Sequence, residues 1–123
     1  MLITSSLSNA KKYNAKYKYF IVINPKNVKS KDLIHFPELA PTRELYNWAM
    51  ANKNTENWFE HYKEQFVHDM HTRIGMINAL NDIEKKARQD DVLLICFCSD
   101  VNQCHRGLIA DELASRGVKV LRN

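Results

Sequence analysis

The continuous apolar run from Val92 to Phe97 constrains the fold of this chain more than any other part of its sequence. An unbroken run of this kind is typical of a β-strand that is buried on both faces, as the central strands of a parallel sheet are. The run is also far too short to span a lipid bilayer. We therefore expect residues 92–97 to form a central strand of a covered sheet.

Further strands and helices are predicted around this run from the spacing of apolar residues. The other expected strands are residues 1–5, 19–23 and 118–121. The helical patterns cover residues 43–53, 59–70, 74–87 and 108–115. Thr42 is a candidate N-cap for the first helix, and Gly117 is a natural C-terminal cap for the last one.

The order of these elements, with helices between the strands, predicts right-handed crossovers and a mostly parallel sheet. We expect an α/β fold, a small Rossmann-like three-layer sandwich of about four strands. The length of 123 residues suits one domain, so residues 1–123 are expected to form a single α/β domain. No secretory signal is recognisable at the N-terminus, which predicts a cytoplasmic location and no membrane partner.

All three cysteines of the chain lie between Cys96 and Cys104. In a cytoplasmic protein they are expected to be free thiols. Structural cysteines tend to be scattered through a core, so this clustering indicates chemistry. The segment connects the buried strand to the last helix, and ligands of open parallel sheets bind beyond the carboxyl ends of the strands.

The tripeptide Cys104-His105-Arg106 is predicted to open the last helix. Unpaired amides at a helix N-terminus favour an anion and lower the pKa of a nearby thiol. We therefore expect Cys104 to be a nucleophile, His105 an acid/base, and Arg106 a clamp for a phosphate or carboxylate. Asp100 is a candidate to orient the base or to cap the helix.

Other residues are expected to line the same edge of the sheet. Thr4 and Ser5 end the first strand, and Cys96 ends the buried strand. The hydroxyl of Tyr62 could reach a polar cleft from a neighbouring helix. With Arg106, these residues form the expected binding site for an anionic small molecule, a nucleotide or part of a nucleic acid.

A metal site is an alternative interpretation of the cysteine segment. Thiolate and imidazole groups bind zinc and iron, and the candidate ligands are Cys98, Cys104 and His105, with or without Cys96. However, paired Cys-x-x-Cys knuckles are absent from the sequence, and the adjacent side chains of Cys104 and His105 are expected to point in different directions. We therefore expect no cofactor. A third interpretation makes Cys96 and Cys98 small core residues without a chemical role.

The first part of the chain is strongly basic, since residues 1–31 contain seven lysines and no acidic residue. Lysines that alternate with aromatic residues can contact phosphates while the rings stack on bases. Nucleic acid is therefore a possible partner through Lys11, Lys12, Lys16 and Lys18. These lysines also support a different class of function, a non-catalytic module that binds nucleic acid or a host protein.

Residues 93–120, with their Cys-His-Arg element, resemble the C-terminal signature of the domain of unknown function 488 family. The stretches LITSSLSNAKKY, PELAPTRELYNW and WFEHYKEQF resemble the same family in the same order. The resemblance implies a compact α/β fold and a bacterial or phage origin, but it supplies no reaction. The positions that it carries over are Thr4, Ser5, Leu39, Ala40, Pro41, Tyr62, Cys96, Asp100, Cys104, His105 and Arg106.

Overall fold

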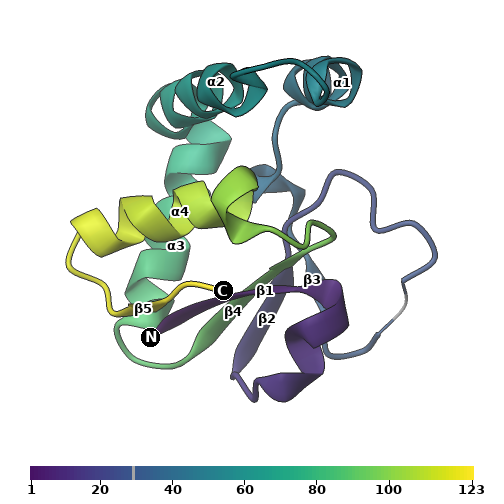
Figure 1. Cartoon of the computed structure of the whole chain (residues 1–123). Helices are drawn as coiled ribbons and strands as arrows, with labels where there is room; N and C mark the ends of the chain where they lie inside the picture. The colour runs from purple at the N-terminus through teal and green to yellow at the C-terminus, as the bar shows by residue number, and fades with distance from the viewer. Residues whose placement is uncertain (29) are drawn as a thin grey trace.

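The central strand of the sheet is β4 (Val92–Cys96), which is buried along its whole length. The computed structural model describes residues 1–28 and 30–123 (Figure 1). Lys29, one of the lysines of the basic N-terminal part, lies outside the described residues. β4 pairs in parallel with β1 (Leu2–Ser6) on one side and with β2 (Tyr17–Phe20) on the other.

Two short strands extend the sheet at its edges. β3 (Ile34–His35) pairs with β2, and β5 (Val120–Leu121) pairs with β1, both in parallel. The strand order in the sheet is β3-β2-β4-β1-β5. The predicted α/β class with a parallel sheet is confirmed, with five strands instead of about four. β3 was missed because it consists of two exposed residues in a loop without apolar periodicity.

Four α-helices and three short 3₁₀ helices appear in the described residues. They are α1 (Arg43–Asn52), α2 (Trp58–Thr72), α3 (Ile74–Ala87), α4 (His105–Ser115), η1 (Leu7–Lys12), η2 (Pro37–Leu39) and η3 (Val101–Gln103). The predicted N-cap is confirmed, because the side chain of Thr42 accepts a hydrogen bond from the Leu45 amide at 3.1 Å. Gly117 follows α4 with a φ of 88°, a left-handed conformation that favours glycine.

Helices α3 and α4 pack directly on the sheet. α4 lies across β1 and β4, and α3 contacts β4 (Figure 1). α2 packs against both α3 and α4, and α1 packs against α2. Helices α1 and α2 therefore lie farther from the sheet than α3 and α4 do. The short helix η1 contacts β1 and β4.

The core lies between the sheet and its helices. The side chains of Leu93 and Leu94 from β4, Phe66 from α2, Leu80 from α3 and Ile109 from α4 are fully buried. Burial of large apolar side chains such as these stabilises the fold by about 1.5–3 kcal/mol each. Among the described residues, no helix combines the length and the apolar composition needed to cross a membrane.

One boundary differs from the sequence prediction in a way that affects the site. β2 ends at Phe20 instead of continuing to Ile23. The amide of Ile21 still donates to the carbonyl of Ile95, but the carbonyl of Ile21 faces the ring of His105. The chain then leaves the sheet, so Val22 and Ile23 line a cleft instead of extending the strand.

Candidate functional site

A cleft opens at the carboxyl edge of the sheet, where β2 and β4 end. Its volume is about 460 Å³, which is within the range of small-molecule sites in proteins. The segments after β2 and β4 form one side of the cleft, and α1 with the start of α2 forms the other. The first residues of α4 lie at its inner end, as expected for a ligand site in an open parallel sheet.

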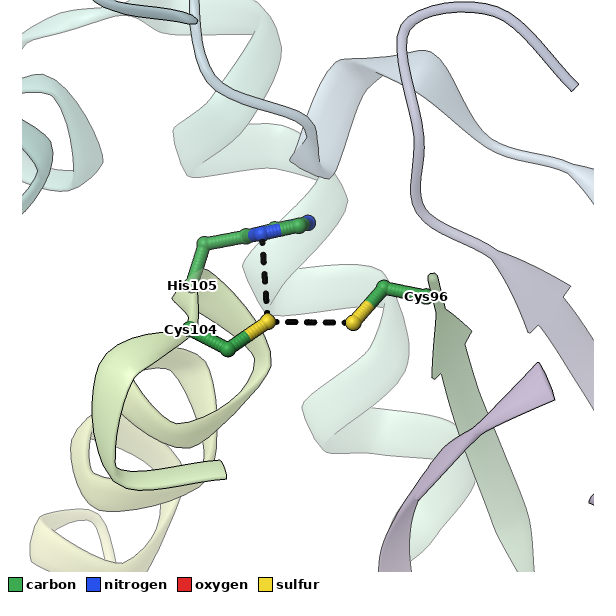
Figure 2. Close-up of side chains that lie close together, drawn as sticks. All are labelled: Cys96, Cys104 and His105. Atoms are coloured by element: carbon green, nitrogen blue, oxygen red, sulfur yellow. Dashed lines mark hydrogen bonds between the residues drawn. The ribbon is translucent and has the colours of Figure 1, made fainter. Parts of the chain in front are cut away.

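The three cysteines form a thiol cluster at this inner end, defined by Cys96, Cys98 and Cys104. Cys96 is the last residue of β4, and Cys104 is the N-cap of α4 in an extended conformation. Their Sγ atoms lie 3.0 Å apart, and both residues are buried (Figure 2). Cys98 is only half-buried, so it is the most accessible of the three thiols.

The imidazole of His105 is held in one orientation beside the thiol cluster. Its Nε2 lies 2.6 Å from the carbonyl oxygen of Ile21. Because a carbonyl only accepts, Nε2 carries the proton, and the lone pair of Nδ1 faces the Sγ of Cys104 at 3.6 Å. Burial lowers the pKa of His105, which keeps the ring neutral.

The guanidinium of Arg106 lies behind the thiol cluster and is almost completely buried. Nη1 donates to the Sγ of Cys96 at 3.0 Å and to the carbonyl of Cys98 at 2.6 Å. Nη2 donates to the carbonyl of Ser99 at 3.3 Å, and Nε donates to the carbonyl of Asn123 at 3.0 Å. Arg106 therefore fixes the loop after β4 and places a positive charge beside the sulfur atoms.

The three thiols of the cluster change one another's pKa values. The neighbouring sulfur atoms of Cys104 and Cys96 lower the pKa of the Cys98 thiol. Hydrogen bonding to Cys104 and Cys98 raises the pKa of Cys96. Of the three thiols, Cys98 therefore combines a lowered pKa with the most access to solvent.

Three basic side chains line the cleft, namely Lys26 after β2 and Arg43 and Lys53 on α1. In the part of the chain that the structure describes, no Asp or Glu side chain lines it. The cleft therefore has a positive electrostatic potential, which favours an anionic ligand.

Aromatic rings lie beside these cations. The amino group of Lys26 is 5.0 Å from the centroid of the Phe97 ring, and that of Lys53 is 5.9 Å from the centroid of Trp58. Tyr46 of α1 is a further ring in the lining. These basic and aromatic residues were missed in the sequence because they come from separate segments without a shared motif.

The structure brings some of the predicted site residues together and places others elsewhere. Cys96, Cys104, His105 and Tyr62 all line the cleft. Tyr62 is buried, and burial together with the nearby sulfur atoms raises its pKa.

The other predicted residues have contacts outside the cleft lining. The hydroxyl of Thr4 bonds to the backbone of Asn123, and that of Ser5 donates to the carbonyl of Ser6. Asp100 caps η3 by accepting from the Asn102 amide at 2.9 Å, rather than orienting His105. The expected phosphate clamp, Arg106, has its donors directed at the protein itself.

The lysines of the alternative partner surface lie elsewhere. Lys11 and Lys12 are exposed on η1, and Lys18 is half-buried on β2. Lys16 is exposed and lies 3.5 Å from Asp90. These lysines and the cleft are therefore two separate candidate surfaces, and a binding experiment can tell them apart.

The chain was compared with protein families, curated proteins and solved structures. The family model described as the active DUF488-N3 subclade, DUF488-N3a, matches residues 4–117. The chain belongs to the DUF488 family. The match includes the end of β1, the cleft-lining helices α1 and α2, and the Cys-His-Arg element. The comparisons with curated proteins and with solved structures gave no match.

Proposed function

We propose that the cleft binds a phosphorylated ligand, a nucleotide or part of a nucleic acid, and that a thiol of the cluster acts on it in the cytoplasm. The single observation that carries this proposal is the composition of the cleft, with three cations and no carboxylate in its described lining. A phosphate group supplies the negative charge that such a lining favours.

The aromatic lining supports a ligand that carries a base. Trp58, Tyr46 and Phe97 present flat apolar surfaces next to the cationic groups. Stacking of a base on such a ring contributes about 1–3 kcal/mol to binding. A nucleotide would therefore use both classes of side chain, whereas inorganic phosphate would use only the cations.

The thiol best placed to act on this ligand is Cys98. It is half-buried and lines the cleft, whereas Cys104, the nucleophile expected from the sequence, is 2% exposed. His105 lies next to Cys104 and is buried. In this proposal, Cys98 contacts the ligand. The buried wall behind Cys98 is formed by Cys96, Cys104 and His105.

The binding half of the proposal is tested by fluorescence titration. In a Trp48→Phe protein, Trp58 of the cleft is the remaining tryptophan and reports on ligand. We expect a nucleoside monophosphate to change its emission. Arg43→Ala and Lys53→Ala should each weaken binding by about tenfold to a hundredfold, as expected for loss of a charged hydrogen bond.

The control is a Lys11→Ala, Lys12→Ala protein, which removes two exposed cations of η1 and leaves the cleft unchanged. We expect it to bind the nucleotide as the parent protein does. Loss of binding in this control, with full binding in Arg43→Ala, would contradict the proposal. That result would support the non-catalytic module that binds through its N-terminal lysines.

A further inference from the structure

The buried wall of the cleft has the chemistry of a metal site. The Sγ atoms of Cys96 and Cys104 and a ring nitrogen of His105 lie within 4.8 Å of one another. Figure 2 shows the three side chains pointing toward one another from β4 and from the start of α4. Two thiolates and an imidazole are a ligand set that suits zinc.

The side chains of Cys104 and His105 converge in the structure, contrary to the sequence prediction. Cys104 and His105 are adjacent, and adjacent side chains were expected to diverge. The backbone of Cys104 is extended, with φ −145° and ψ 148°, whereas His105 begins the helix. This change of backbone conformation brings the Sγ of Cys104 and the Nδ1 of His105 to 3.6 Å.

The orientation of His105 is a second, independent observation. Its Nε2 proton is bound to the carbonyl of Ile21, so the free lone pair of Nδ1 points at the sulfur atoms. A backbone carbonyl that fixes the far nitrogen of a ligating histidine is a recurrent feature of metal sites. Arg106 adds a contact on the other side, because its guanidinium donates a hydrogen bond to the Sγ of Cys96 at 3.0 Å and fixes the position of this sulfur.

We propose that Cys96, Cys104 and His105 bind a zinc ion whose fourth position faces the cleft. Zinc–ligand distances of about 2.3 Å to sulfur and about 2.0–2.1 Å to nitrogen place sulfur and nitrogen about 3.5–3.6 Å apart in a tetrahedron, and two sulfurs about 3.8 Å apart. The observed distance of 3.6 Å between the Sγ of Cys104 and the Nδ1 of His105 already agrees. The sulfur atoms, at 3.0 Å, separate by about 0.8 Å when the ion binds.

The fourth position makes this a site for chemistry rather than for structure alone. Structural zinc sites have four protein ligands, whereas catalytic sites keep one position for water or substrate. All three ligands line the cleft, so that position is reached by whatever enters it. Cys98 is left as a free thiol beside the ion.

The test is a titration of the full-length, reduced chain without a histidine tag, using Zn²⁺ and Co²⁺ as probes. We expect the chain to bind one Co²⁺. The bound ion should give the intense visible bands of tetrahedral cobalt and a sulfur-to-cobalt charge-transfer band, and these bands should disappear when Zn²⁺ displaces it. Cys96→Ser and Cys104→Ser should each lower the affinity on the order of a hundredfold. The matched control, Cys98→Ser, should bind cobalt with the parent spectrum.

X-ray absorption of the zinc-loaded parent protein keeps the proposal testable if a serine variant fails to fold. It should show two sulfur and two lighter ligands. Three sulfurs, no saturable binding, or an unchanged spectrum in Cys104→Ser would overturn the proposal. Arg43→Ala should keep the cobalt spectrum while its nucleotide binding weakens, so failure of the proposed function and failure of the metal site give different results.

Discussion

Arg106 is the residue whose position most changes the interpretation of the site. Its guanidinium is almost fully buried and donates to three carbonyl groups and to the Sγ of Cys96. A buried charge that holds several backbone groups acts mainly on the conformation of the loop. We therefore assign Arg106 to positioning the thiol cluster; in the proposed function, the anion contacts belong to Arg43, Lys26 and Lys53.

This assignment predicts that Arg106→Met reduces the free energy of unfolding by about 3 kcal/mol, because three carbonyl groups and the Sγ of Cys96 lose their donor. Chemical denaturation measures this change. Arg43→Ala is the matched control, since Arg43 is exposed at the start of α1 and should alter ligand affinity but not stability. An Arg106→Met protein of parental stability would show that the buried contacts of Arg106 do not hold the loop.

At the residue scale, the sequence identified Cys96, Cys104 and His105 as cleft residues because they lie in a compact motif. It identified Tyr62 because a hydroxyl on a neighbouring helix could reach a polar cleft. The sequence did not identify Arg43, Lys53 or Trp58. These residues come from α1 and α2, and only the packing of these helices brings them close to the motif. The directions of the side chains were also not predictable from the sequence. The convergence of Cys104 and His105 depends on one extended residue at a helix N-cap.

Among the elements, the junction between η3 and α4 determines where the site residues lie. Gly107 is the third residue of α4, and a Cβ at this position would collide with the carbonyl oxygen of Val101. The close contact of η3 with α4 therefore requires glycine. This contact holds the loop that carries Cys98 and Asp100 against the helix that carries Cys104.

Gly107→Ala should consequently reduce the free energy of unfolding by about 1–3 kcal/mol, as overpacking does. Gly75→Ala is the control, because that glycine is in helix α3 with no atom within 4 Å of an added Cβ. There alanine should stabilise the protein by about 0.5–1 kcal/mol through its helix propensity. Thermal or chemical unfolding of both variants tests the pair, and equal effects would contradict the proposed contact.

Most helices and strands were predictable from the sequence. The apolar run at 92–97, the N-cap Thr42 and the helical spacing up to Ala87 led to β4, α1 and α3 with small boundary errors. Two elements depended on information that local sequence lacks. β3 has no apolar pattern, and β2 ends early because the carbonyl of Ile21 bonds to His105, which is distant in sequence.

On the scale of the whole molecule, charged side chains connect the helices that cover the sheet. Glu84 of α3 bonds to Arg88 and to Arg116, which follows α4, and Arg116 also pairs with Glu112. His71 of α2 lies 3.0 Å from Glu112. The network therefore links α2, α3 and α4 on the outside of the fold.

This network predicts a dependence of stability on pH. Hydrogen bonds from Arg88 and Arg116 lower the pKa of Glu84 below its usual value. A lowered carboxyl pKa stabilises the fold above the unfolded-state pKa, and this contribution is lost as the pH falls through the folded-state pKa. Glu84→Gln should therefore lower Tm slightly at neutral pH and have no effect in acid. A decrease of equal size at both pH values would contradict the assignment.

In the proposed function, the cleft between β2, β4 and α1 binds a phosphorylated ligand. The most direct measurement is amide NMR shift mapping with a nucleoside monophosphate. We expect saturable shifts at residues of α1 and at Cys98, Cys104 and His105. Shifts confined to η1 and Lys16, or no saturable shift at the cleft, would contradict it.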